Sequence, residues 1–202
     1  RVHRTVTAKL PGIVGLAAFI GWERRTPEPM LDVNIFRNLR FSAASLSVTV
    51  AFFALAGFIF LITQYFQFLK GYGPLETGFR LLPVATSVAI SSIVGTQLAV
   101  RYGTKFIVGG GLVTLSVAYG WVSTSGVDTS YLEIACQMIF LGTGMGLTSA
   151  PATESIMGAV SNAKAGIGSA VNDTTRELGG TLGVAVIGSV FASLYQDAFK
   201  VD

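Results

Sequence analysis

Five long stretches of this chain contain no charged residue, and they constrain its fold more than any other feature. They contain 29, 20, 22, 20 and 19 residues, at 41–69, 81–100, 106–127, 134–153 and 178–196. A helix needs about 20 apolar residues to cross a hydrocarbon core of roughly 30 Å. Mean hydropathy is +0.61, and only 12% of residues are charged. We therefore predict an all-α, polytopic transmembrane helix bundle with five full spans, at about 42–69, 79–100, 105–125, 131–151 and 165–195.

A sixth apolar stretch, residues 10–22, is too short for a complete crossing and is followed by Glu23, Arg24 and Arg25. One interpretation is a helix cut short at its start. The other is a signal peptide, although no convincing small-residue cleavage site follows. We predict a truncated or non-native segment with a partial helix at 1–22, a loop at 23–41, and an outer-side tail at 197–202 before a missing last helix.

The distribution of basic residues predicts the orientation of the bundle. If the helices alternate in direction, one set of loops carries eight lysines and arginines and the opposite set carries three. The positive-inside rule places the richer set in the cytoplasm. The loop at 23–41 is therefore predicted to be cytoplasmic, and the protein to be a multi-pass protein of a cell membrane, most simply a bacterial inner membrane.

Several function classes find no support in the sequence. Cys136 and His3 are the only residues of their types, which argues against a disulfide or a Cys/His metal site within the chain. The motifs HExxH, GxSxG and CxxC are absent, so we predict neither catalytic residues nor a cofactor. Basic residues are spread over loops rather than clustered, which argues against nucleic-acid binding.

Asp173, Arg176 and Glu177 form a charged cluster at helical spacing just before the last span. The 19 uncharged residues after Glu177 would extend about 28 Å, nearly a whole hydrocarbon core. The cluster is therefore expected at the cytoplasmic boundary. There Arg176 would pair with the carboxylates of its own helix or cap neighbouring helix ends at an inner gate. Direct proton coupling through the carboxylates is the alternative.

Other residues within the spans fall into two groups. Polar and aromatic side chains could line a substrate cavity, although a tyrosine also fits an interfacial aromatic belt; the candidates are Gln64, Tyr65, Gln67, Gln137 and Asn172. Small residues four apart allow close helix packing, and a proline can bend or end a helix. The packing candidates are Gly142, Gly146, Pro151, Gly179 and Gly183.

Three separated runs carry a family resemblance: ERRTPEPMLDVNIFRNLRFSAAS, QYFQFLKGYGPLETGFRLLPVA, and LGTGMGLTSAPATESIMGAVSNAKAGIGSAVNDTTRELGGTLGVAVIGSV. In this order they resemble the C-terminal half of fourteen-helix drug:proton antiporters of the EmrB/QacA type, in the major facilitator superfamily. The resemblance implies proton-coupled efflux of lipophilic or cationic small molecules. It also implies that the five spans correspond to helices nine to thirteen, and that the N-terminal half is missing, so the chain would be a fragment.

The run LAVRYGTKF is similar to the cytoplasmic gating loop of that superfamily. Arg101, Gly103 and Lys105 keep its basic and turn elements, whereas Val100 stands where the acidic residue would be. An alternative to transport is a membrane protein, or truncated gene product, that carries nothing and only assembles with other helices. A half alone lacks the opposing repeat that alternating access requires.

Overall fold

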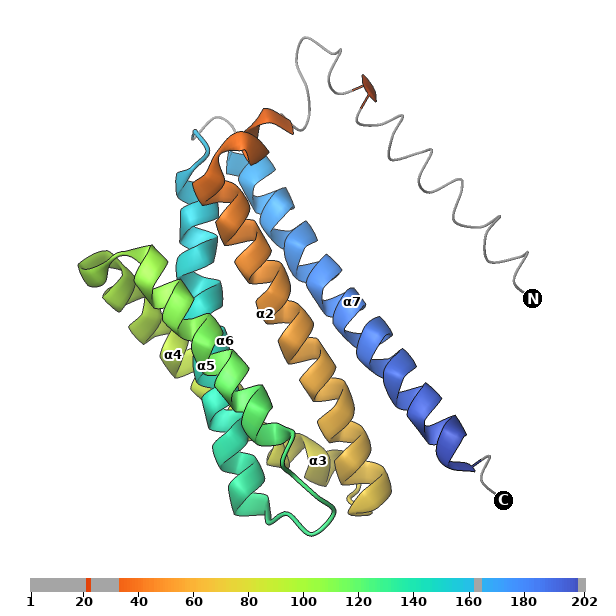
Figure 1. Ribbon diagram of the computed structural model, residues 1–202. Coiled ribbons are helices and arrows are strands. Elements are labelled where there is room, and N and C mark those ends of the chain that lie inside the picture. The colour runs from red at the N-terminus through yellow and green to blue at the C-terminus, as the bar shows by residue number, and fades with distance from the viewer. Residues whose placement is uncertain (1–20, 23–32, 162–164, 200–202) are drawn as a thin grey trace. The chain divides into compact units, whose positions relative to one another are not determined.

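The computed structural model describes residues 21–22, 33–161 and 165–199 (Figure 1). The chain divides into two compact units, residues 1–42 and 43–202. In the first unit, the short 3₁₀ helix η1 (Val33–Arg37) precedes α2 (Leu39–Gln64), which continues into the second unit. The Asn38 side-chain oxygen accepts a hydrogen bond from the Arg40 amide at 3.0 Å and so caps α2. Apart from residues 21–22, the partial helix expected at 10–22 lies outside the described residues.

The second unit is helical wherever the structure describes a regular element. After α2, a π-helical turn, η2 (Tyr65–Leu69), leads to α3 (Pro74–Arg80) and α4 (Leu82–Tyr102). The remaining helices are α5 (Thr104–Val122), α6 (Tyr131–Gly158) and α7 (Ala165–Phe199). This confirms the predicted all-α class.

Four helical stretches within the described residues are long and apolar enough to cross a membrane: Leu39–Leu69, Pro74–Tyr102, Thr104–Val122 and Ala165–Leu194. They fall on four of the five predicted spans. The fifth prediction, 131–151, falls on α6, which has sufficient length at 28 residues but is not among these four stretches. Its glycines, threonines and Gln137 are largely buried against other helices, which explains how a span-length helix can carry them.

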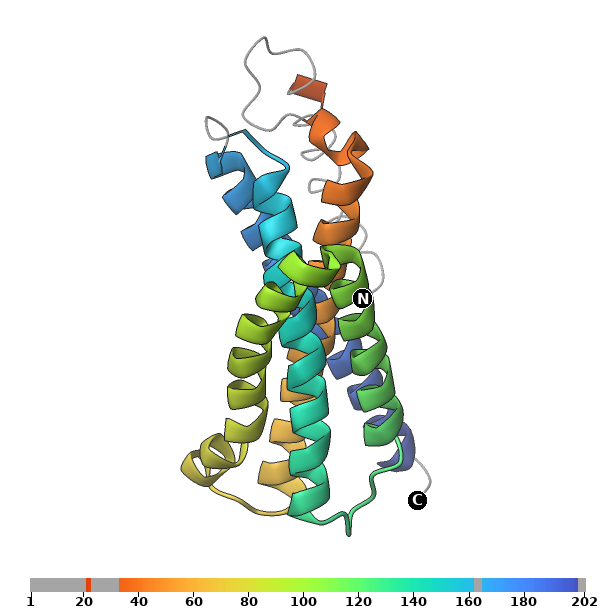
Figure 2. The ribbon, with the colours of Figure 1, turned by 90° about the vertical axis from the view of Figure 1, so that its left-hand side faces the viewer.

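Helix α6 lies between α4 and α5, as Figure 2 shows. Its small residues allow this close approach. A Cβ atom added at Gly142 would lie 2.6 Å from the Val84 carbonyl oxygen of α4, and one at Gly146 would lie 2.7 Å from the Val88 carbonyl oxygen. Ser91 of α4 also donates a hydrogen bond to the Gly142 carbonyl at 3.2 Å. The predicted glycine pair therefore lies at the contact with α4.

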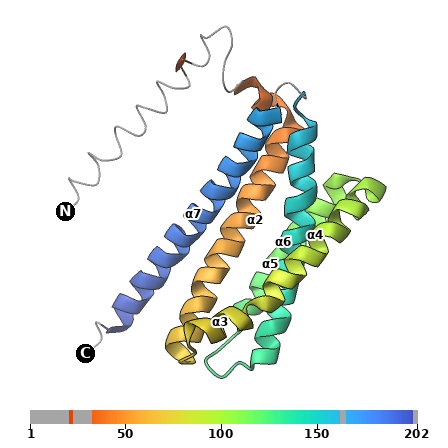
Figure 3. The ribbon, with the colours of Figure 1, turned by 180° about the vertical axis from the view of Figure 1, so that it is seen from behind.

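Helices α2 and α7 run side by side (Figures 1 and 3). Gly179 and Gly183 of α7 lie against the α2 backbone, where an added Cβ would overlap the carbonyl oxygens of Thr49 and Phe53. The second predicted glycine pair is thus also placed at a helix–helix contact. Glycine contacts consequently join α7 to α2, and α6 to α4.

Several predicted boundaries differ from the structure. Part of the expected linker after the first span forms α3, because Pro74 is suited to the first turn of a helix. Helix α6 continues seven residues beyond Pro151 to Gly158, so that proline does not end it. Helix α7 reaches Phe199, well into the predicted tail, and α2 begins at Leu39 within the predicted loop.

Candidate functional site

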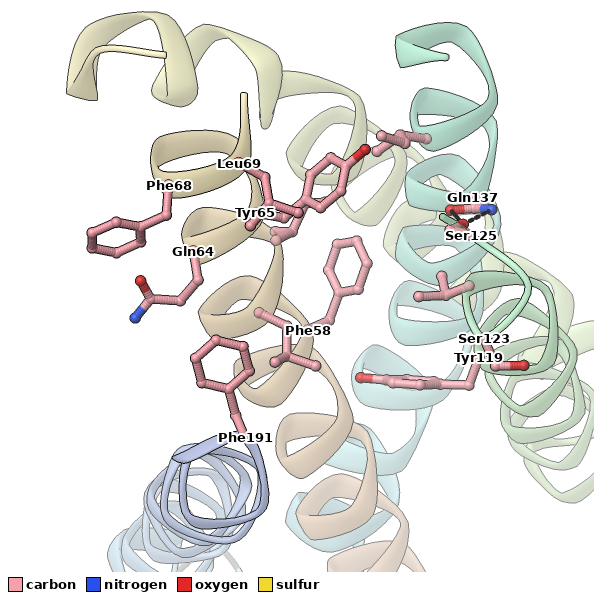
Figure 4. Close-up of a pocket in the computed structure, with 14 residues that line it drawn as sticks. Phe58, Gln64, Tyr65, Phe68, Leu69, Tyr119, Ser123, Ser125, Gln137 and Phe191 are labelled. Carbon is pink, nitrogen blue, oxygen red and sulfur yellow. Dashed lines mark hydrogen bonds between the residues drawn. The ribbon is translucent and has the colours of Figure 1, made fainter. Parts of the chain in front are cut away.

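A cavity of about 970 Å³ lies among α2, η2, α5, α6 and α7, towards the end of the bundle where α2 ends and α6 begins (Figure 4). Its lining is chiefly apolar and aromatic. The lining residues are Phe58, Leu61, Ile62, Gln64, Tyr65, Phe68, Leu69, Tyr119, Val122, Ser123, Ser125, Ile134, Gln137 and Phe191. Its volume is within the usual range for a drug-sized ligand, and so is its mixture of aromatic walls with few polar groups.

Most polar groups of the lining are bonded within the protein. The Gln137 amide donates to the Ser125 hydroxyl at 2.8 Å, as Figure 4 shows. The Tyr119 hydroxyl donates to the Ala54 carbonyl, which ties α5 to α2. The Tyr65 hydroxyl lies 3.2 Å from the Val127 carbonyl oxygen in the α5–α6 loop. These groups position the walls, and their hydrogen-bonding capacity towards a ligand is reduced.

Three of the five predicted cavity residues line this cavity, and two do not. Gln64, Tyr65 and Gln137 line the cavity. Gln67 is exposed and does not line it, because the π-helical turn after Gln64 rotates it away. Asn172 is buried in α7 and hydrogen-bonds to Thr153 of α6 instead. Gln67 and Asn172 therefore do not line this cavity.

The charged cluster of α7 does not form the predicted pairs within its own helix. The Arg176 guanidinium donates to the Thr153 hydroxyl at 3.1 Å and lies 5.2 Å from the centre of the Phe52 ring of α2. The Thr153 hydroxyl in turn donates to the Asn172 side-chain oxygen at 3.0 Å. Arg176 thereby connects α2, α6 and α7. The Asp173 and Glu177 side chains are exposed.

The predicted gating loop is a single residue between two helices. Gly103 has φ +92° and ψ 137°, a backbone conformation that residues other than glycine rarely adopt. Arg101 and Lys105 on either side are exposed. The structure thus assigns the turn to Gly103 and leaves both basic side chains free of ion pairs with described residues.

One cluster of contacting side chains, around Arg80, was not predicted. The Arg80 guanidinium lies over the rings of Tyr72 and Tyr131, 4.0 and 4.7 Å from their centres. Arg80 also forms an ion pair with Glu76 at 2.8 Å. The only sequence signal for this contact is the four-residue spacing of Glu76 and Arg80, whereas Tyr131 comes from a distant helix. The cluster holds α3 against the start of α6.

The structure contains no group of three or more His, Cys, Asp or Glu side chains that could hold a metal ion within the residues it describes. The cavity lining contains no ionisable acid or base other than its two tyrosines. The arrangement can accordingly hold a molecule by apolar and aromatic contact, and it offers no acid–base pair for chemistry on that molecule.

Comparison with known proteins gives consistent matches. Residues 6–184 match the family model described as Major Facilitator Superfamily. The chain is 33% identical over 190 residues to the multidrug resistance protein Stp of Mycobacterium tuberculosis, covering 94% of this chain and 35% of that protein. It is 30% identical to the multidrug efflux pump LfrA of Mycolicibacterium smegmatis, covering 94% and 38%. It is 27% identical to the tetracenomycin C resistance and export protein of Streptomyces glaucescens, covering 97% and 36%. The chain thus spans less than two-fifths of the length of these relatives.

Proposed function

This chain belongs to the Major Facilitator Superfamily, and from that premise we propose that it forms part of a proton-coupled efflux transporter for lipophilic or cationic small molecules. The family is one of transporters and not of enzymes, and the chain is a multi-pass membrane protein. The observation that carries the proposal is the aromatic cavity of about 970 Å³ within a bundle of membrane-length helices. The names of the relatives, which include a multidrug efflux pump and an export protein, support an exported substrate.

We further propose that the chain supplies the C-terminal half of a fourteen-helix antiporter in a bacterial inner membrane, with α6 as a fifth span. Helix α6 is 28 residues long and extends about 42 Å, more than the thickness of a hydrocarbon core. Its polar residues Gln137, Thr148 and Ser149 are buried, while Ile139 and Phe140 are exposed. Such a helix can remain in lipid although it carries several polar residues.

Asp173 and Glu177 are the proposed proton-coupling groups, and Arg176 is proposed to hold the inner gate. The two carboxylates are exposed on α7, whereas Arg176 contacts α2 and α6. Changing Asp173→Asn and Glu177→Gln together removes both titratable groups and is expected to abolish efflux driven by a proton gradient. Passive binding of a dye should be retained. Unchanged proton-driven efflux in the double variant would exclude both carboxylates from coupling.

The transport proposal is tested with cells that lack their own drug exporters. The cells are loaded with cationic ethidium or uncharged 1-N-phenylnaphthylamine, and dye loss is followed with and without a proton gradient. Expression of the full-length protein should accelerate the loss of at least one dye, and collapse of the gradient should stop it. Retention of both dyes would refute transport and favour the alternative, a membrane protein that only assembles with other helices. Residues 1–202 expressed alone are expected to be inactive.

A further inference from the structure

The described walls of the cavity contain no charged side chain, and the positively charged Lys70 lies against one of them. No Asp, Glu, Lys or Arg is among the lining residues. The Lys70 ammonium lies 5.6 Å from the centre of the Tyr65 ring, which is part of the lining. The same ammonium donates to the Val127 carbonyl at 2.8 Å and is held in place there. A cationic ligand would therefore meet a positive charge that no carboxylate in this chain's described lining offsets.

Gln64 differs from the other polar residues of the lining. Gln137 and Ser125 bond to each other, Tyr119 and Tyr65 bond to backbone carbonyls, and the Ser123 hydroxyl donates to the Gly120 carbonyl at 2.7 Å. The Gln64 amide forms no hydrogen bond with any described residue. It is half-buried on the side of α2 nearest Phe68 and Phe191 (Figure 4). A free amide can both donate and accept a hydrogen bond.

From this arrangement we infer that the cavity selects uncharged aromatic compounds that carry a hydrogen-bonding group, and that Gln64 is the residue that recognises that group. The inference rests on the proposed function and narrows it, since it assigns the uncharged class of substrate to this cavity. Phe58, Phe68 and Phe191 supply aromatic surface for a planar ligand. The Gln64 amide supplies specificity for a ligand with a hydrogen-bonding group, because an apolar wall alone discriminates poorly among ligands of similar size.

Three probes with similar fused rings test the inference by direct binding. Phenanthridinone is uncharged and carries an amide, phenanthrene is uncharged without a hydrogen-bonding group, and ethidium is a phenanthridinium cation. Binding of each probe to the purified full-length protein is measured in lipid nanodiscs, with empty nanodiscs as the blank. Wild-type protein is expected to bind phenanthridinone more tightly than ethidium. Gln64→Leu is expected to weaken phenanthridinone binding about three- to tenfold, the loss of one hydrogen bond, and to leave phenanthrene binding unchanged.

Gln67→Leu is the matched control, because Gln67 lies three residues further along but outside the cavity. It should leave the binding of all three probes unchanged. Gln64→Glu introduces a carboxylate and is expected to tighten ethidium binding about fivefold or more. Helical circular dichroism of each variant shows that it is folded.

Three results would overturn the inference. The first is equal weakening of phenanthrene and phenanthridinone by Gln64→Leu, which would mean that Gln64 acts only on the shape of the cavity. The second is wild-type protein that binds ethidium as tightly as phenanthridinone. The third is that Gln64→Leu has no effect on the binding of phenanthridinone. Binding as expected without any dye export by cells would instead refute the transport proposal and leave the cavity's selectivity standing. Dye export by cells, together with no effect of Gln64→Leu on binding, would refute the inference about Gln64 and leave the transport proposal standing.

Discussion

Replacement of Gly146 by alanine tests the close approach of α4 and α6 most directly. The added Cβ would lie 2.7 Å from both the Ser92 amide nitrogen and the Val88 carbonyl oxygen of α4. Each distance is about 0.7 Å shorter than ordinary van der Waals contact at 3.4 Å. Because both atoms belong to the backbone, no rotamer change can relieve the overlap, and the two helices must separate.

The expected effect is a net loss of stability. Overpacking of a tight contact costs about 1–3 kcal/mol. Alanine is the better helix former by about 0.5–1 kcal/mol, which offsets part of that cost. We therefore expect Gly146→Ala to reduce the free energy of unfolding by about 1–2 kcal/mol, measured by equilibrium unfolding in mixed detergent micelles.

Gly110→Ala in α5 is the matched control. A Cβ at Gly110 has no atom within 4 Å, so only the gain in helix propensity applies. This variant should be as stable as the wild type or more stable by up to about 1 kcal/mol. If Gly146→Ala showed the same small gain as Gly110→Ala, α4 and α6 could not approach as closely as described.

Two further changes address the polar contact of α7 and the turn between α4 and α5. Thr153→Val removes the hydroxyl that accepts from Arg176 and donates to Asn172; it should lower the free energy of unfolding by about 1–3 kcal/mol, since it leaves polar groups unpaired. Thr174→Val, on the exposed face of α7, is its control and should change stability by less than about 0.5 kcal/mol. Gly103→Ala places alanine at a backbone conformation with φ +92° and should lower the free energy of unfolding by about 1–3 kcal/mol in the same assay. Gly109→Ala, at an open helical position, is the control and should not lower it. Equal stability of these two variants would contradict the observed turn.

The sequence predicted the helices well because lipid leaves the backbone few alternatives. A span-length uncharged segment must satisfy its own amides and carbonyls, and a helix does this locally. The glycine pairs were also predictable, since small residues four apart lie on one helix face. Such local rules do not decide how far a helix continues, which is why the end of α6 beyond Pro151 was missed.

The site depends on contacts between distant residues, and these were harder to predict. Tyr119 and Phe58 were not among the expected cavity residues, because nothing local distinguishes them from other aromatic residues in apolar helices. Arg176 has carboxylates three and one residues away, yet it binds the Thr153 hydroxyl 23 residues earlier. Gln67 lies outside this cavity, and the sequence carries no signal for the wider π-helical turn that contains it.

Within the second unit, glycine contacts join α2 to α7 in one group. In the other group they join α6 to both α4 and α5, where Gly111 of α5 lies against Gly144 of α6. The cavity lies where these groups face each other, with Phe58 and Phe191 on one side and Tyr119 and Ile134 on the other. A change in tilt between the groups would widen or narrow the cavity without breaking the glycine contacts inside either group. Such a change in tilt would strain the Tyr119–Ala54 and Arg176–Thr153 hydrogen bonds, which join the two groups, so the size of ligand that the cavity admits depends on how far these two bonds can stretch.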